Sequence, residues 1–316
     1  MAILQKFMEK INSKMPCTAE LGYNEPMALH TTFKVGGPAD LWIKPEKEHF
    51  PAYTAFLLGA ARAEGIPVFI LGGGANLVVS DRGIRGIVLD TGAWSGCDFF
   101  PGKKESSGEA IILGGTQADT AVEAAAGQGW GGLEFLAGMP GSIGGAVWMN
   151  ARCYEKSVSD VLLETELLDE ALNRRVAYYI PEEYGYKKSP FQNRDVLILS
   201  ARFAMKKRPE AEMRQEMGSR RLDREAKGHY RFPCAGSAFK NNRDFGKPTG
   251  KIIDGLGLRG LTRGGAQVSP WHGNLIINTG NATAADIRGL VEEIVTRVNS
   301  LLGIELEPEI LFVGEP

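Results

Sequence analysis

The hydroxyl group of Ser237 is a candidate for acid–base chemistry. Ser237 lies in the segment PCAGSAFKN, residues 233–241, between a glycine that permits a turn and a strand-like run. The segment lacks the GxSxG setting of a hydrolase nucleophile, and His229 is the one imidazole close to it in the sequence. A serine without an obvious base suits proton donation better than nucleophilic attack. Taken alone, these residues favour a simpler role, in which the serine satisfies a turn.

A glycine-rich loop between two apolar, β-rich runs could bind phosphate. Residues 66–90 read IPVFILGGGANLVVSDRGIRGIVLD. In a dinucleotide-binding fold or a P-loop the glycines open a helix, and a P-loop also ends in Gly-Lys-Ser/Thr. Here the second run, from Leu77, continues as a strand, so residues 72–76 are predicted to form a loop between strands. Its backbone N–H groups can still bind a pyrophosphate, although a plain tight connection is about as common.

A second glycine-rich segment, AGMPGSIGGAVWMNA, occupies residues 137–151. Ser142 is predicted to cap a short helix, and the small residues 144–146 allow close backbone approach. Close approach is what a flat or phosphorylated ligand requires, whereas tight helix packing is the competing explanation. Together, the two loops favour a large cofactor that carries phosphate.

Seven segments, in order from Thr31 to Gly314, resemble the UDP-N-acetylenolpyruvoylglucosamine reductase family. They are TTFKVGGPAD (31–40), LGGGANLVV (71–79), AGMPGSIGGAVWMNA (137–151), GYKKSPFQ (185–192), AGSAFKN (235–241), GGAQVSPWHGNLIIN (264–278) and LEPEILFVG (306–314). The resemblance implies an oxidoreductase that uses non-covalent FAD, with NADPH as hydride donor. Its expected reaction reduces the enolpyruvyl ether of UDP-N-acetylglucosamine-enolpyruvate to UDP-N-acetylmuramate for peptidoglycan. No extra tyrosine-bearing loop follows residues 185–192, as in the shorter subtype of the family.

The resemblance also implies a role for particular residues. Ser237 would donate the proton, while Glu309 and Lys187 would stabilise the enol-like intermediate. The cofactor-binding residues that it implies are Gly72, Gly73, Gly74, Ala75, Asn76, Leu77, Gly138, Pro140, Gly141, Ser142, Gly144, Gly145 and Ala146. The substrate-binding residues that it implies are Lys240, Asn241, His272 and Asn274, of which His272 better fits a structural hydrogen bond.

The chain departs from the family pattern at two places. Lys187 stands where the family carries arginine, which keeps the charge but loses the planar fork that grips a carboxylate. Lys188 is an alternative, and two surface lysines beside a turn are the simpler explanation. Arg152, Cys153 and Glu155 stand where the family has small residues and glycine, which leaves the local backbone conformation open.

Composition excludes several other classes of protein. The 316 residues carry 36 basic and 38 acidic side chains, so the net charge of −2 gives no global electrostatic case for nucleic acid or an anionic membrane surface. The four cysteines form no CxxC pair, which argues against a metal site or a disulfide framework. We expect no secretory signal, because the first twenty residues place lysines among the apolar positions, and no apolar stretch of about 20 residues could span a membrane. We therefore expect a cytoplasmic location; the oligomeric state stays open.

The periodicity of apolar residues predicts an α+β fold. Predicted helices cover the amphipathic first twenty residues and residues 50–64, 118–126, 206–228 and 283–303. The last helix has the apolar stripe Ile287, Leu290, Val291, Ile294, Val295, Val298, Leu301 and Leu302. A final strand is predicted over residues 305–313, with Glu305, Glu307 and Glu309 on one face.

Three parts are expected along the chain. Residues 1–29 form an N-terminal helix and extension, and for residues 30–205 the family resemblance implies a two-lobed FAD-binding domain of the vanillyl-alcohol-oxidase (PCMH) type. Residues 206–316 form a C-terminal α+β substrate-binding domain. Two other functions compete with the reductase: a flavin-dependent oxidase on the same scaffold, and a non-catalytic protein that binds flavin or a nucleotide-sugar. Neither glycine loop contains a histidine that could tether the flavin.

Overall fold

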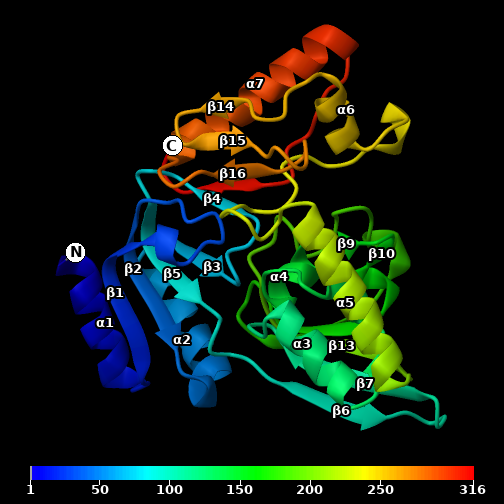
Figure 1. Ribbon diagram of the computed structural model, residues 1–316. Coiled ribbons are helices and arrows are strands. Elements are labelled where there is room, and N and C mark those ends of the chain that lie inside the picture. Colours follow the sequence, from blue (N-terminus) through cyan, green and yellow to red (C-terminus); the bar gives the residue numbers. More distant parts are fainter. Residues whose placement is uncertain (1) are drawn as a thin grey trace. The chain divides into compact units, whose positions relative to one another are not determined.

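The computed structural model describes residues 2–316 and divides the chain into two compact units (Figure 1). Unit 1 comprises Met1–Tyr23, Leu41–Gly73 and Gly86–Arg221, of which Met1 lies outside the described residues. Unit 2 comprises Asn24–Asp40, Gly74–Arg85 and Leu222–Pro316. The first glycine-rich loop therefore contributes Gly72 and Gly73 to unit 1 and its remaining residues to unit 2.

The N-terminal part of unit 1 packs helices on a four-stranded sheet, although one end of β1, β2 and β5 belongs to unit 2. The helices are α1 (Ala2–Lys14) and α2 (Phe50–Ala63); the strands, in the order β1-β2-β5-β3, are β1 (Ala19–Pro26), β2 (Pro38–Pro45), β5 (Ile84–Asp90) and β3 (Val68–Leu71). Helix α2 buries Phe50, Tyr53 and Leu57 on one face and is followed by Gly65 at φ 67°. Both the amphipathic first helix and the helix ending near Gly65 are confirmed.

A larger antiparallel sheet forms the rest of unit 1. Its strands, in the order β12-β11-β13-β7-β6, are β12 (Arg174–Tyr178), β11 (Leu162–Leu168), β13 (Leu197–Lys207), β7 (Ser107–Leu113) and β6 (Cys97–Pro101), and β8 (Trp130–Gly131) also pairs with β13. Its helices are α3 (Ala118–Gly127), α4 (Ile143–Trp148) and α5 (Glu210–Ala226), and β9 (Arg152–Cys153) and β10 (Lys156–Ser157) form a hairpin. The core between these elements includes Ala121, Leu136, Val147 and Phe203. The helix predicted over residues 118–126 is confirmed as α3. The helix predicted over residues 206–228 is confirmed as α5, but it begins at Glu210 because Lys206 and Lys207 pair as the end of β13.

Unit 2 packs one long helix on short strands. Its helices are α6 (Thr249–Gly255) and α7 (Ala284–Leu302), and its strands are β4 (Leu77–Val79), β14 (Thr262–Arg263), β15 (Ala266–Val268), β16 (Ile276–Asn278) and β17 (Leu311–Val313). Thr283 and Asp286 form the capping box that starts α7, and Gly303 ends it at φ 65°. Helix α7 is therefore confirmed with both of its ends.

Two details of the predicted C-terminal region are wrong. The apolar stripe of α7 is buried only as far as Val298, because Leu301 and Leu302 on the last turn are 65% and 49% exposed. The last strand is three residues long instead of nine: Pro308 forms an isolated bridge with Phe239, and only Leu311–Val313 pairs with β4. These two partners interrupt the alternation, so the three carboxylates do not share an exposed face. Glu305 and Glu307 are exposed, whereas Glu309 is 8% exposed.

Short 3₁₀ helices connect these elements. They are η1 (Met27–Leu29), η2 (Lys47–His49), η3 (Glu134–Leu136), η4 (Val158–Asp160), η5 (Pro181–Glu183) and η6 (Arg243–Phe245). No helix among residues 2–316 is both long and apolar enough to cross a membrane.

Candidate active site and cofactor loops

The segment that carries Ser237 lies between two other segments of unit 2. Ser237 forms a bridge with Leu275 and Phe239 forms one with Pro308, so the segment is held from both sides although β-pairing is only local. Ser237 itself is half-buried. This setting fixes the backbone at the serine more firmly than an isolated turn would.

Asn274 holds the same segment through three hydrogen bonds. Its Oδ1 accepts the N–H of Phe239 at 2.9 Å, and its Nδ2 donates to the carbonyl of Phe239 at 2.8 Å. Its own carbonyl accepts the N–H of Ala238 at 2.9 Å. Asn274 is 2% exposed, so both ends of its amide are used inside the protein. This arrangement fits a residue that positions the serine segment, a contribution that its sequence motif did not indicate.

Glu309 is joined to the serine segment through the backbone. Its N–H donates to the carbonyl of Ala238, the residue after Ser237, at 2.8 Å. Asn76 Nδ2 donates to the carbonyl of Glu309 at 3.0 Å, and the N–H of Leu311 donates to the carbonyl of Asn76 at 2.9 Å. Three segments that are far apart in the sequence therefore meet in unit 2. These are the backbone segments of Ser237 and Glu309, which were predicted to act together, and the last part of the first glycine loop.

Lys240 and Asn241 continue from this segment toward α6. Lys240 Nζ forms an ion pair with Glu307, and its N–H donates to the carbonyl of Glu307 at 2.9 Å. Asn241 Oδ1 accepts the N–H of Thr249 at 2.9 Å, and Thr249 Oγ1 donates to the carbonyl of Lys240 at 2.8 Å. The exposed Asn241 thus sits in a turn that is fixed at the first residue of α6.

His272 makes a local structural contact. Its Nδ1 accepts the N–H of Asn274 at 3.1 Å, which leaves the proton of the neutral ring on Nε2. Burial lowers the pKa of His272, partly offset by the carboxylate of Asp254. Burial, with Arg224 and His272 nearby, lowers the pKa of His229 to about 3, and the two imidazole rings lie 6.3 Å apart. Both histidines are therefore neutral at physiological pH.

Within unit 1 the two glycine-rich loops pack directly on each other. A Cβ at Gly73 would lie 2.5 Å from the Cα of Gly141 and 2.9 Å from the backbone nitrogen of Ser142. A Cβ at Gly72 would collide with the hydroxyl of Ser142. Side chains are excluded because the neighbouring atoms are mostly backbone. Close approach was predicted for residues 144–146 and is seen at Gly144, where a Cβ would lie 3.0 Å from the carbonyl oxygen of Gly114; the approach of one loop to the other was not predicted.

The short helix α4 begins as predicted, but its first amide groups are already used. Ser142 Oγ accepts the N–H of Gly145 at 3.3 Å and so caps the helix. The N–H of Ile143 donates to Thr116 at 2.8 Å, and that of Gly144 donates to the carbonyl of Gly114 at 2.7 Å. The helix N-terminus is therefore seated on residues 114–116, a glycine-containing turn whose importance the sequence analysis missed.

The remaining predicted cofactor residues differ in their exposure. Pro140 is exposed, whereas Ala146 is 5% exposed and belongs to the core of unit 1. In unit 2, the carbonyl of Gly74 accepts the N–H of Thr32 at 3.1 Å, and Leu77 begins β4 after Ala75 and Asn76.

Lys187 lies in unit 1, in a tight turn closed by hydrogen bonds between Gly185 and Lys188. Its backbone has φ 55°, a conformation that costs a non-glycine residue roughly 1 kcal/mol or more. Gln192 Nε2 donates to its carbonyl at 3.1 Å, and Asn150 Nδ2 donates to the carbonyl of Gly185 at 2.8 Å. The turn is thus held in place around the lysine.

The second departure from the family pattern forms the β9–β10 hairpin. Tyr154 and Glu155 have φ values of 50° and 62°, the pair of positive angles that a two-residue hairpin turn requires. Arg152 donates to Glu155 Oε2 at 2.8 Å and to Ser157 Oγ at 3.1 Å. The hairpin keeps, with larger residues, a backbone that glycine would adopt without strain.

No group of three or more His, Cys, Asp or Glu side chains in the described part of the chain could hold a metal ion. The four cysteines are all free thiols.

Comparison with known proteins supplies the family. The model of the FAD binding domain matches residues 54–171, and that of the UDP-N-acetylenolpyruvoylglucosamine reductase C-terminal domain matches residues 228–313. The reductase of that name from Treponema denticola is 38% identical over 306 residues, 93% of each chain. The one from Borrelia garinii subsp. bavariensis is 38% identical over 312 residues, 98% of this chain and 97% of the relative.

A solved structure agrees with these relatives. The crystal structure of UDP-N-acetylenolpyruvylglucosamine reductase from Thermus caldophilus superposes with a TM-score of 0.74 at 33% identity, over 94% of this chain and 99% of that one. The predicted α+β class, with an FAD-binding domain and a C-terminal domain, is confirmed. With relatives of this identity over nearly its whole length, the chain belongs to the UDP-N-acetylenolpyruvoylglucosamine reductase family.

Proposed function

We propose that this protein is an NADPH-dependent flavoenzyme that reduces the enolpyruvyl ether of UDP-N-acetylglucosamine-enolpyruvate to UDP-N-acetylmuramate, a peptidoglycan precursor. Membership of the family supports this activity. The observation that carries it is local: the N–H of Glu309 donates at 2.8 Å to the carbonyl of Ala238, the residue after Ser237, so the segments that carry the acid and the hydroxyl are bonded to each other. Neither an oxidase nor a passive binding protein would need this pair.

The residues of the two glycine loops fit FAD. They present backbone in place of bulky side chains, and pyrophosphate is commonly bound by such loops. We propose residues 72–77 together with Gly138, Pro140, Gly141, Ser142, Gly144, Gly145 and Ala146 as the FAD-binding set. Because neither loop contains a histidine, the cofactor is non-covalent. Bound FAD, reduced by NADPH, supplies the hydride.

Ser237 supplies the proton. Hydride added to the terminal carbon of the enolpyruvyl group breaks its C=C π bond and leaves an electron pair on the carbon that bears the ether oxygen and the carboxylate. That electron pair takes the proton of the Ser237 hydroxyl, so a C–H bond forms as the O–H bond breaks. Solvent then returns a proton to the serine oxygen. The balance is one hydride and one proton added to one double bond.

Glu309 and Lys187 stabilise the negative charge before the proton arrives. The carboxyl group of Glu309 acts on the enol-like intermediate, and the ammonium of Lys187 attracts the substrate carboxylate. Lys240 and Asn241 contact the substrate's phosphates, with His272 as a further candidate. Asn274, first considered with them, acts through the position of the serine segment.

The remaining expectations follow from this function. Residues 1–29, 30–205 and 206–316 form the N-terminal extension, the FAD-binding domain and the substrate-binding domain. A cytoplasmic location fits the use of NADPH and a nucleotide-sugar.

One titration tests the proposed function. The purified protein should show a flavin spectrum, NADPH should bleach it without oxygen, and the enolpyruvyl UDP-sugar should then restore it. Heat denaturation should release free FAD. Reoxidation by oxygen alone, with no response to the UDP-sugar, would favour the oxidase, and a colourless protein would contradict FAD binding.

A further inference from the structure

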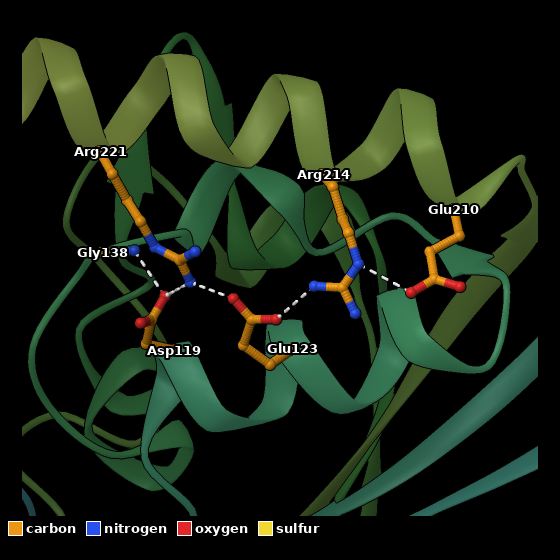
Figure 2. Close-up of polar contacts among 6 residues, drawn as sticks. All are labelled: Asp119, Glu123, Gly138, Glu210, Arg214 and Arg221. Carbon is orange, nitrogen blue, oxygen red and sulfur yellow. Dashed lines mark hydrogen bonds and ion pairs between the residues drawn. The ribbon is translucent and has the colours of Figure 1, made fainter.

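A row of ion pairs joins α3 and α5 of unit 1 (Figure 2). Arg221 Nη2 donates to Asp119 Oδ1 at 2.7 Å and to Glu123 Oε1 at 2.6 Å. Two turns earlier on α5, Arg214 donates to Glu123 Oε2 at 3.0 Å and to Glu210 Oε1 at 2.7 Å. These five side chains are 33–50% exposed, and exposed ion pairs contribute little to the free energy of unfolding. The row is not explained by stability alone.

Asp119 differs from the other carboxylates of the row because it also binds backbone. The same oxygen that accepts from Arg221 accepts the N–H of Gly138 at 2.7 Å, as Figure 2 shows. Gly138 has φ 69° and opens the second glycine-rich segment. A carboxylate that accepts a backbone N–H forms one of the stronger hydrogen bonds in proteins. Arg221 in turn fixes the carboxylate, and this ion pair raises the pKa of the arginine.

The beginning of α3 holds the second glycine-rich segment at a further point. Ala118, the residue before Asp119, donates its N–H to the carbonyl of Gly141 at 2.8 Å. Gly141 is the residue against which Gly73 of the first loop packs. The first two residues of α3 therefore fix both ends of residues 138–141, and through them the surface that faces the first loop.

We propose that Asp119 and Arg221 are positioning residues for FAD, an inference that rests on the proposed function. Asp119 holds the amide of Gly138, and Arg221 holds Asp119, so that residues 138–142 keep the conformation that binds the cofactor. Neither side chain needs to touch FAD. When such a loop relaxes, the fraction of binding-competent protein falls and the apparent Kd rises by the same factor.

The experiment compares four variants of the full chain after removal of FAD. The Kd for FAD is measured by flavin fluorescence, and the midpoint of thermal unfolding of the flavin-free chain is measured beside it. Asp119→Ala loses both contacts and should raise the Kd about 10-fold, equivalent to about 1.4 kcal/mol. Asp119→Asn keeps an oxygen for Gly138, and Arg221→Ala keeps the carboxylate, so each should raise the Kd on the order of 3-fold.

Arg214→Ala is the matched control. It removes an arginine of the same helix and the same row, but its partners are Glu210 and Glu123, whereas Arg221 also holds Asp119, the carboxylate that accepts the N–H of Gly138. Its Kd for FAD should equal that of the wild type, and its unfolding midpoint should change as little as that of Arg221→Ala.

The outcomes separate this inference from the proposed function. A wild-type chain that does not bind FAD would refute the proposed function. A wild type that binds FAD, with Asp119→Ala and Arg221→Ala binding it equally well, would overturn the positioning role alone. The positioning role would also be wrong if Arg214→Ala weakened FAD binding as much as Arg221→Ala does. If Asp119→Ala fails to fold, Asp119→Asn and Arg221→Ala still decide the question.

Discussion

Changing Asn274 to aspartate should damage the serine segment while keeping the shape of the side chain. The oxygen that accepts the N–H of Phe239 is retained, but the Nδ2 donor is replaced by an oxygen that faces the carbonyl of Phe239, now 2.8 Å from Nδ2. A buried carbonyl left without its donor costs about 1–3 kcal/mol. Asn274→Ala removes both bonds and should cost about twice that.

The pH dependence identifies the cause. The introduced carboxyl is buried, which raises its pKa in the folded state above its unfolded value. The folded variant then binds more protons than the unfolded one, so its free energy of unfolding recovers relative to the wild type as the pH falls. A protonated carboxyl can again donate to Phe239. Urea unfolding at pH 7 and pH 5 measures the effect, and a deficit that is unchanged between them would refute the explanation.

Activity provides the second measurement. If Asn274 positions Ser237, then Asn274→Asp should slow transfer from reduced flavin to the UDP-sugar by on the order of 10- to 100-fold, because small displacements of a reacting group are costly. Reduction of the flavin by NADPH should stay near the wild-type rate in anaerobic stopped flow.

Asn278→Asp is the matched control for that measurement. Asn278 is also buried, and its Nδ2 donates to the carbonyl of Phe33 at 3.1 Å. Its contact with the serine segment is made by its backbone N–H, which donates to the carbonyl of Pro233 at 2.9 Å and is kept in the variant. It should lose stability comparably but transfer hydride normally. If both variants slowed the transfer equally, general destabilisation would explain the result and the positioning role would be wrong.

Three further changes test other parts of the account. Gly73→Ala should weaken FAD binding at least 10-fold in a fluorescence titration, because the added Cβ would lie 2.5 Å from the backbone of Gly141. Gly218→Ala is the control, since its Cβ would meet no atom within 4 Å, and its affinity for FAD should not change. Equal affinities of the two variants would refute the role of the loop packing. The pKa of His229 is about 6.5 in the unfolded state and about 3 in the folded state. Between about pH 6.5 and pH 3 the unfolded state therefore binds a proton that the folded state does not. The free energy of unfolding falls as the pH falls through this range, by up to about 1.4 kcal/mol per pH unit. In urea titrations His229→Gln should show a smaller loss over this range, and an unchanged slope would contradict the shift. Lys187→Arg should keep or raise the steady-state activity, because it restores the planar guanidinium that binds a carboxylate with two hydrogen bonds. Lys187→Met should lower the activity at least 10-fold. Full activity of the methionine variant would show that Lys187 is not part of the site.

The elements with strong local signals were predictable from the sequence. Helix α7 carries a capping box at Thr283, a regular apolar stripe and a terminal glycine, and each of these acts within a few residues. The cap at Ser142 is equally local. These features were predicted correctly because the interactions that stabilise them involve residues close together in the sequence.

The errors arose where distant segments decide the structure. Residues 305–310 alternate like a strand, yet Pro308 pairs with Phe239 and only residues 311–313 pair with β4. That pairing buries Glu309, which alternation alone would leave with its exposed neighbours. No local pattern could assign Asn274 to the backbone of Phe239, thirty-five residues away.

The charged helix α5 shows a different limit. Its composition predicts a solvated face, and its arginines are partly exposed. Yet Arg221 and Arg214 differ in what their partners touch, since only Asp119 also accepts the amide of Gly138. The sequence gives the charges of such a row but not which pair in it reaches the second glycine-rich segment.

The most direct test of the proposed function is Ser237→Ala, measured in two half-reactions. FAD binding and flavin reduction by NADPH should stay near wild type, because neither uses the serine proton. Reoxidation of the reduced flavin by the enolpyruvyl UDP-sugar should slow by about 10²- to 10⁴-fold, the usual contribution of a general acid. Ser237→Cys should recover part of the lost rate, because a thiol can also donate a proton. If the UDP-sugar reoxidised the flavin of Ser237→Ala at the wild-type rate, Ser237 would have only a structural role in its turn, and the proposed active site would be wrong.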